Sequence, residues 1–253
     1  MVGMFDGGKV TLRLLSAAAL LGAFLFAPGA WSQEEREPLQ LSALPSTGRV
    51  DYEVIRKGEK IGTHSVVFRH DGRDLEVATW TDIAVKLLGV TLYRFRYQAE
   101  ESWIDGQLTR LTSRTDNDGE PLTVNLAKTG DRIRGTCNGI PLDLPADTIP
   151  ISVWHPDFIR QSVILDQYKC AAQKVRTADQ GTEFIPAGPK SVKARHYALS
   201  GDVRRDVWYG PDGQTLQVLF PAKDGSKIAF VMRPSPPPAA ARSLTKSSAE
   251  SAP

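Results

Sequence analysis

The sequence predicts a single all-β, mainly antiparallel domain over residues 49–233, folded as a strongly curved meander or a partly open β-barrel with one short helix. Three observations predict this fold class. Asp-Gly or Asn-Gly pairs, which suit tight hairpin turns, recur six times after residue 49. Glycines up to Gly139 follow one another at steps of 9–17 residues, which leave room for one strand each and none for a βαβ crossover. Between the turns, apolar and polar residues alternate.

The first 32 residues have the features of an export signal that precedes the domain. Two basic residues are followed by the uncharged run 14–26. A helix of that length covers about 20 Å, which is too short for the roughly 30 Å hydrocarbon core of a bilayer. Small residues at Ala30 and Ser32 suit a signal peptidase, so we expect cleavage after Ser32 and a soluble periplasmic protein without a transmembrane segment. An uncleaved N-terminal anchor is the alternative. Residues 33–48 form a polar lead-in.

Alternation of apolar and polar residues defines the strands of the domain. In the segment 93–103 every second residue is apolar, apart from Glu101, and the residues between them are polar. A period of two places one face of a strand against a core and the other in water. The same alternation recurs in the segments 50–54, 75–87, 122–126, 216–220 and 228–232. Together with the turns, these segments predict about eleven or twelve strands.

The regular pattern is interrupted at 141–167, which contains four prolines. Pro156 suits the first turn of a helix, and Asp157 suits the positive end of the helix dipole. We therefore expect one short helix over 157–163 that closes one end or one open face of the curved sheet. The residues that this helix turns inward are expected to be Phe158, Ile159 and Val163.

Composition and charge exclude several classes of protein. The chain is 41% hydrophobic and 24% charged, which is typical of a globular domain and not of a collagen-like, fully disordered or polytopic membrane protein. A formal net charge of +2 gives no indication of nucleic acid binding. Residues 234–253 are rich in Pro, Ala and Ser, and we expect them to form a disordered tail.

No motif in the sequence predicts catalysis, a metal site or a cofactor. The four histidines lack the spacing of metal ligands, and no nucleophile elbow, Walker loop or dinucleotide fingerprint occurs. Glu101 is a carboxylate on an otherwise apolar strand face, and a buried carboxylate sometimes marks a functional site. Because Glu101 lies near a strand end, we expect it to reach solvent or a neighbouring arginine.

The two cysteines, Cys137 and Cys170, allow two interpretations. In the oxidising compartment that an exported protein reaches, they are able to form a structural disulfide. They are equally able to be two unrelated buried thiols that behave as small hydrophobic residues. Their separation of 33 positions in sequence says nothing about their distance in space.

Aromatic residues are the richest indication of a binding site. Large aromatic side chains commonly do no more than fill a β-core. A sheet too curved to fill its own interior instead leaves an apolar cavity, a recurrent site for apolar ligands. The candidate ligand-binding residues under this second hypothesis are Trp80, Tyr93, Phe95, Tyr97, Trp103 and Trp208. The arginines of the domain, among them Arg94 and Arg205, are expected to form a solvated outer face, and contact with an anionic lipid headgroup or a partner surface is the secondary interpretation.

Three stretches of the chain are similar to a known family. They are Asp51-Tyr52-Glu53-Val54 through Gly58 to Ile61-Gly62-Thr63-His64, Trp154-His155-Pro156 through Leu165-Asp166, and Asp206-Val207-Trp208-Tyr209 with Gly213, Leu219-Phe220 and Gly225. In order and spacing they resemble an uncharacterised family of exported proteins of Gram-negative bacteria, over about residues 50–232. The resemblance implies a periplasmic, antiparallel and partly open β-barrel, and it implies no activity. His155 stands where the family often has asparagine, and Cys170 where a glycine is expected, so neither is assigned a family-wide role.

These observations predict an exported, non-catalytic binding module for an apolar or amphipathic ligand such as a lipid or acyl chain. The alternative is a structural or interaction protein of the cell envelope, which has a solid core and docks a partner on an outer face or a sheet edge. A hydrolase that uses His64 or His155 is the third hypothesis.

Overall fold

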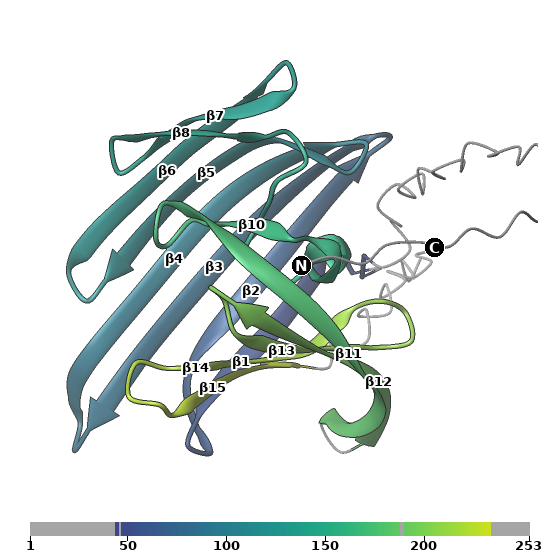
Figure 1. Ribbon diagram of the computed structural model, residues 1–253. Coiled ribbons are helices and arrows are strands. Elements are labelled where there is room, and N and C mark those ends of the chain that lie inside the picture. Colours follow the sequence, from purple (N-terminus) through teal and green to yellow (C-terminus); the bar gives the residue numbers. More distant parts are fainter. Residues whose placement is uncertain (1–43, 46, 188–189, 234–253) are drawn as a thin grey trace, which may run out of the picture. The chain divides into compact units, whose positions relative to one another are not determined.

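The computed structural model describes residues 44–45, 47–187 and 190–233 (Figure 1). The predicted signal at 1–32, most of the lead-in at 33–48 and the tail at 234–253 lie outside the described residues. In the described part, fifteen strands and one 3-10 helix account for nearly the whole domain. The strands are β1 (Arg49–Arg56), β2 (Glu59–Asp71), β3 (Asp74–Leu87), β4 (Val90–Ile104), β5 (Gln107–Asn117), β6 (Glu120–Thr129), β7 (Arg132–Cys137), β8 (Ile140–Pro145), β9 (Ile149–Pro150), β10 (Val163–Asp166), β11 (Ala171–Ala187), β12 (Lys190–Gly201), β13 (Arg205–Tyr209), β14 (Thr215–Pro221) and β15 (Lys227–Met232). The predicted all-β class is confirmed, with more strands than the eleven or twelve expected.

All fifteen strands form one sheet in the order β8-β7-β6-β5-β4-β3-β2-β1-β15-β14-β13-β12-β11-β10-β9. Neighbouring strands are antiparallel throughout, except that β9 and β10 run parallel. Because almost every strand pairs with the next one in sequence, the local turn pattern determines most of the topology. The first and last strands meet in the middle of the sheet, where Tyr52 of β1 lies opposite Met232 of β15.

The two edges of the sheet lie near each other although they do not pair. Strand β8 ends at Pro145 and β9 begins at Ile149 on the opposite edge, so four residue steps, at most about 14 Å, separate them. The sheet must therefore curl almost into a ring, and the predicted partly open barrel is confirmed. Pro141, Pro145 and Pro150 all lie in the edge strands, which tolerate a residue without an N–H donor. These short edge strands explain part of the difference between the fifteen strands of the structure and the eleven or twelve expected.

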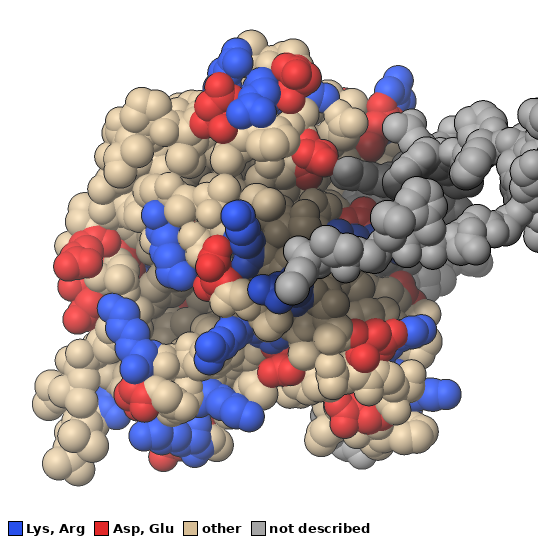
Figure 2. All heavy atoms as spheres, in the orientation of Figure 1, with Lys and Arg blue, Asp and Glu red and all other residues tan. Residues whose placement is uncertain are grey.

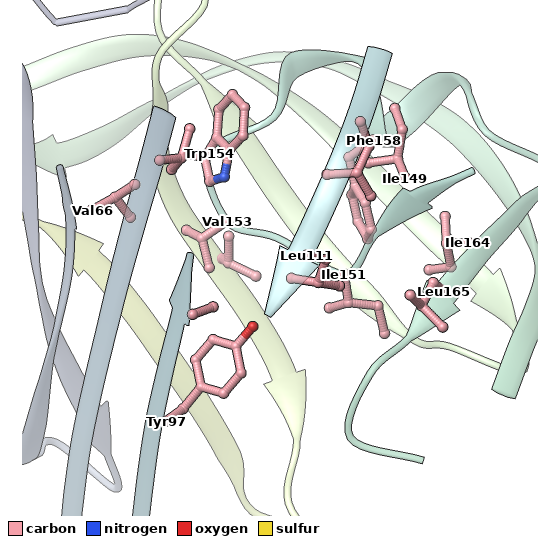
Figure 3. Packing of buried hydrophobic residues seen from close by; sticks show 14 of the residues in the cluster. Val66, Tyr97, Leu111, Ile149, Ile151, Val153, Trp154, Phe158, Ile164 and Leu165 are labelled. Carbon is pink, nitrogen blue, oxygen red and sulfur yellow. The ribbon is translucent and has the colours of Figure 1, made fainter. Parts of the chain in front are cut away.

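The segment that follows β8, residues 149–168, consists of β9 and β10 with the residues between them and just after them, and we call it the plug segment. Its apolar side chains belong to the same core as the strands that surround it. Figure 3 shows side chains of this core: Ile149, Ile151, Val153, Trp154, Phe158, Ile164 and Leu165 of the plug segment, with Val66, Tyr97 and Leu111 of the sheet.

The expected helix is present as a single turn of 3-10 helix, η2 (Pro156–Arg160), which ends three residues earlier than predicted. His155 caps it, because the His155 Nδ1 accepts a hydrogen bond from the Asp157 backbone N–H at 3.1 Å. Phe158 is buried as expected, whereas Val163 is 37% exposed. Val163 begins β10, whose inward-facing residues are those that follow it.

Alternation assigns the inner face of most strands correctly. In β4, Tyr97, Ala99, Glu101 and Trp103 are all buried, as the period of two predicts. Leu216 is an exception, because the register between β13 and β14 shifts between Trp208 and Tyr209. The shift turns Leu216 away from Val218, and it packs in a small separate cluster with Trp208.

The sulfur atoms of Cys137 and Cys170 lie 2.03 Å apart, at disulfide distance, and their Cα atoms are 5.4 Å apart. Cys137 ends β7, and Cys170 stands between β10 and β11. Strands β7 and β10 are each second from opposite edges of the sheet, so the cysteine pair joins its two ends. Among the described residues, no helix has the length and hydrophobicity needed to cross a bilayer.

Candidate functional site

A cavity of about 480 Å³ lies between the plug segment and the concave face of the sheet. Its walls are mostly apolar and come from strands that are distant in sequence. The apolar residues that line it include Ile61, Ile83, Val85, Phe95, Ile151, Val153, Phe220, Ile228 and Phe230. A smaller number of polar side chains are distributed among them, which is the usual composition of a site for a small organic ligand.

Three of the six predicted ligand-binding aromatics line this cavity. Tyr93, Phe95 and Tyr97 stand at alternate positions of β4 and face inward. The rings of Phe95 and Tyr97 meet the ring of Tyr168, at the end of the plug segment, with centroids 5.9 and 5.0 Å away and edge-to-face geometry. The aromatic face of β4 therefore forms one wall of the cavity.

The other three aromatics, Trp80, Trp103 and Trp208, do not line this cavity. Trp80 lies on the outer face, 43% exposed, because its neighbours Thr79 and Thr81 take the inward positions of β3. Trp103 is 1% exposed and fills the core in edge-to-face contact with Trp154, at a centroid distance of 5.5 Å. Trp208 faces away from the interior.

Trp208 belongs to the small separate cluster on the opposite face of β13. Its ring stacks on His196 at a centroid distance of 4.2 Å. Its indole N–H donates a hydrogen bond to Glu183 Oε1 at 2.6 Å. Because Val207 and Tyr209 face the main core, the alternation of β13 places Trp208 on the other side.

Glu101 is buried, 3% exposed, and lines the cavity, contrary to the expectation that it reaches solvent or an arginine. Its Oε2 accepts a hydrogen bond from the Trp103 indole N–H at 3.0 Å. Burial raises the pKa of Glu101 to about 7, and the indole donor acts in the opposite direction. The carboxyl group is therefore a mixture of its neutral and charged forms near neutral pH.

His64 presents an imidazole to the cavity from β2. It is 5% exposed, and its Nδ1 lies 2.8 Å from Thr81 Oγ1. Its Nε2 has no hydrogen-bond partner among the described residues. Burial lowers the pKa of His64 to about 3, and the positive charge of Arg205 acts in the same direction. A histidine with so low a pKa is a weak base at neutral pH, which favours binding over proton transfer as its role.

Gln167, which sequence reasoning missed, does not line the cavity but holds two residues that do, Ile151 and Tyr97. Its side chain is 1% exposed and bonds to both backbone groups of Ile151, donating to the carbonyl at 2.7 Å and accepting from the N–H at 3.1 Å. The Gln167 amide also donates to the Tyr97 hydroxyl at 3.2 Å. It therefore links two parts of the plug segment to the aromatic wall.

Arg205, expected on the solvated outer face, lines the cavity. Its guanidinium lies over the ring of Phe220, 5.1 Å from the centroid. The alternation of β13 contained this information, because Arg205 shares a face with the buried residues Val207 and Tyr209. The local run of charged residues 204–206 obscured it.

One end of the cavity is bordered by strand ends and by the β14–β15 turn. Arg56, at the end of β1, forms an ion pair with Asp224 of that turn at 2.6 Å and a hydrogen bond with Ser226 at 2.9 Å. Figure 2 shows one face of the molecule, which is hollowed near its centre, with lysine and arginine side chains along the border of the hollow. No group of three or more His, Cys, Asp or Glu side chains suited to a metal ion occurs in the described part of the chain.

Comparisons with known proteins are consistent with this fold and assign no activity. A model of the domain of unknown function DUF6134 matches residues 52–233. The structure is similar to that of a protein from Brucella abortus, described as a β-barrel-like protein of domain of unknown function DUF1849, with a TM-score of 0.52 and 10% sequence identity. The similarity covers 73% of this chain and 95% of that one, and it concerns the fold alone. No curated protein matches the sequence.

Proposed function

We propose that this chain, which belongs to the DUF6134 family of domains of unknown function, is an exported binding module for an apolar or amphipathic ligand such as a lipid or acyl chain. The observation that carries the proposal is the cavity of about 480 Å³ inside the curved sheet. Cavities for small organic ligands usually measure about 300–1,000 Å³ and combine apolar walls with a few polar groups. This one has that size and that composition.

The arrangement of the walls supports an elongated ligand. The aromatic residues Tyr93, Phe95 and Tyr97 follow one another along a single strand, each two residues from the next. Successive positions on one face of a strand are about 7 Å apart, so the three rings cover a path of about 14 Å. A path of that length suits an acyl chain better than a compact molecule.

The cavity also favours a binding module over the two alternative functions. An envelope protein that acts only through an outer face has no need of a void in its core, and a void of this size forfeits packing energy. A hydrolase needs a base near the nucleophile that works at neutral pH. The pKa of His64 is lowered to about 3 by burial, so His64 serves poorly as that base, and the same is true of His155.

A periplasmic location forms part of the proposal. The sequence features of residues 1–32 support export with cleavage after Ser32, and a cysteine pair at disulfide distance suits an oxidising compartment. The intact mass of protein isolated from the periplasmic fraction should correspond to a chain that starts at Gln33. Full-length protein in the membrane fraction would contradict export with cleavage.

The binding proposal is tested by extracting lipids from protein purified from its native periplasm and identifying them by mass spectrometry. We expect a roughly stoichiometric lipid in the wild type and its loss in Phe95→Arg, because the longer cation occupies the cavity. Phe184→Arg is the matched control. Phe184 is 70% exposed on β11, so the same substitution there should leave the lipid content unchanged.

Folding of both variants is checked by circular dichroism before the lipids are compared. Equal lipid content in Phe95→Arg and Phe184→Arg, with both folded, would show that any lipid binds elsewhere. If the wild type contains no lipid and also fails to bind added fatty acid, the proposed lipid-binding function is wrong.

A further inference from the structure

Arg205 is a cavity-lining cation without an anionic partner. It forms no ion pair and no side-chain hydrogen bond with any described residue, and its one specific contact is the ring of Phe220. Many arginines of the described residues have carboxylate partners, among them Arg49, Arg56, Arg94, Arg132, Arg134 and Arg195. The other described arginines without such a partner, Arg69, Arg96, Arg110, Arg114, Arg176 and Arg204, are exposed to water, whereas Arg205 is only partly exposed.

The carboxylates near Arg205 are already engaged by other groups. Glu101, in the same cavity, accepts the indole N–H of Trp103. Asp166 accepts the backbone N–H of Tyr168 at 3.0 Å and forms an ion pair with Lys169 at 3.4 Å. Asp224, at the border of the cavity, pairs with Arg56.

Leaving a guanidinium unpaired in such surroundings has a cost in free energy. A buried charge without a partner destabilises a fold, and native proteins normally pair or hydrogen-bond such groups. The burial of Arg205 lowers the pKa of its guanidinium, and Tyr168 and Asp166 oppose this effect only in part. Part of the Arg205 side chain remains accessible, because it faces the cavity and not a packed neighbour.

A second polar group faces the same cavity without a partner. His64 is 5% exposed, its Nδ1 is held by Thr81, and its Nε2 is unpartnered among the described residues. When the Thr81 hydroxyl donates to Nδ1, the proton of the neutral ring resides on Nε2, which then offers a donor to the cavity. The cavity therefore has a fixed cation, Arg205, and a buried imidazole nitrogen, His64 Nε2, that no described residue engages.

We propose that the ligand of this cavity carries an anionic head group, a carboxylate or a phosphate, which the Arg205 guanidinium binds, with His64 as a second polar contact. This inference rests on the proposed function and adds the chemical class of the ligand. The planar guanidinium offers paired N–H donors that match a carboxylate or phosphate in bidentate fashion. The apolar wall formed by Phe95, Ile228 and Phe230 then receives the hydrocarbon part.

The test compares three probes that share the same eighteen-carbon chain: oleate, oleoyl lysophosphatidate and uncharged oleyl alcohol. Affinities are measured by isothermal titration calorimetry with delipidated wild type, Arg205→Met, Arg205→Lys and the control Arg204→Met. Arg204 is the exposed neighbour of Arg205 in sequence. In the wild type, we expect at least one of the two anions to bind about tenfold to a hundredfold more tightly than the alcohol.

Arg205→Met should remove that preference and leave the affinity for oleyl alcohol unchanged or improved, because methionine extends the apolar wall. Arg205→Lys should keep part of the preference, because the charge remains and the bidentate geometry is lost. Arg204→Met should behave as the wild type. The anion that binds more tightly identifies the head group as carboxylate or phosphate.

The stability of the ligand-free variants gives an independent readout. Removing a half-buried cation that has no anionic partner should leave the thermal midpoint of Arg205→Met equal to or higher than that of the wild type, whereas a structural arginine would lower it. A lower midpoint, or equal binding of all three probes in wild type and Arg205→Met, would overturn this inference and leave the binding module standing. Failure of all three probes to bind the wild type would overturn both proposals.

Discussion

Three buried ionisable side chains give the domain opposing responses to pH. The pKa values of His64 and His155 are lowered to about 3 by burial, and the pKa of Glu101 is raised to about 7 by burial. Below pH 6.5 the unfolded chain takes up protons on the histidines that the folded protein does not, so their contribution to stability is lost as the pH falls towards 3. The contribution of Glu101 has the opposite sign: it is complete below about pH 4.5 and is lost as the pH rises through about 7.

The His155 effect can be isolated with His155→Asn. Asparagine is a good N-cap residue, so the hydrogen bond to the Asp157 N–H should survive. Between pH 7 and pH 4.5 the wild type should lose about 2 to 3 kcal/mol of unfolding free energy through His155, and the variant should not. Urea unfolding at the two pH values measures the difference. The exposed position His70→Asn serves as control, and equal losses in wild type and His155→Asn would contradict the prediction.

Glu101→Gln should change the dependence of the unfolding free energy on pH at the alkaline end, whereas His155→Asn changes it at the acidic end. The amide oxygen retains an acceptor for the Trp103 indole, while the ionisation is removed. Between pH 4 and pH 8, ionisation of Glu101 should lower the unfolding free energy of the wild type by about 3 kcal/mol. Glu101→Gln should not show this loss. The same substitution at Glu100, an exposed neighbour, is the control. A pH profile unchanged by Glu101→Gln would show that the carboxylate finds compensation in the fold.

At the scale of the elements, the β3–β4 hairpin combines exposed apolar residues with an unusual turn. Leu87, Leu88, Val90 and Leu92 are 57–96% exposed, and Leu88 is the most exposed of them. Leu88 and Gly89 both have positive φ, 49° and 84°. Left-handed backbone costs a leucine roughly 1 kcal/mol or more, whereas asparagine adopts it readily.

Leu88→Asn should therefore stabilise the domain by about 0.5 to 1 kcal/mol, although it removes a large apolar side chain. The reciprocal change is available in the β7–β8 hairpin, where Asn138 has a φ of 51° and is exposed. Asn138→Leu should destabilise by a similar amount. Thermal unfolding of both variants measures the effect, and a loss of stability in Leu88→Asn would mean that Leu88 makes contacts outside the described chain.

The individual elements show which parts of the fold could be predicted from the sequence. Hairpins such as β3–β4 could be predicted because a turn pair and two alternating strands are local information. The inward face of β4, and with it the aromatic wall at Tyr93, Phe95 and Tyr97, followed from the same period of two. Trp80 was misassigned although the alternation of Thr79 and Thr81 already placed it outside.

The rest of the site depends on contacts between segments that are far apart in sequence. Gln167 was invisible because its partners, Ile151 and Tyr97, lie 16 and 70 positions away. Strand β9 has two residues, too few to show any period. The unpaired state of Arg205 becomes evident only when every neighbouring carboxylate has been located, which requires the folded structure.

At the scale of the whole molecule, the Cys137–Cys170 pair joins the two ends of a sheet that does not close by hydrogen bonds. Thiol titration of unfolded, unreduced protein should find no free cysteine. Closing a loop of this length should contribute roughly 3 to 4 kcal/mol in the chain-entropy model. Cys137→Ala combined with Cys170→Gly should lose about that amount in urea unfolding, less whatever glycine recovers at the left-handed φ of 55° of residue 170. Two reactive thiols in the wild type would contradict the bond.

The meeting of β1 with β15 has a consequence for the order in which the protein folds. Most strands pair with a neighbour in sequence and close short loops, whereas this ladder joins residues about 180 positions apart, and the Arg233 N–H bonds to the Asp51 carbonyl at 2.8 Å. The two halves of the sheet, β1–β8 and β9–β15, are each able to form early from local hairpins. Pairing of β1 with β15 joins the two halves, and this step should be slow because its contacts are distant in sequence. Until the two halves pair, β1 and β15 remain open edges that are able to pair with other molecules. A chain that ends before residue 227 should therefore accumulate as an aggregation-prone product, and the full chain should depend on chaperones until the C-terminal strand has paired with β1.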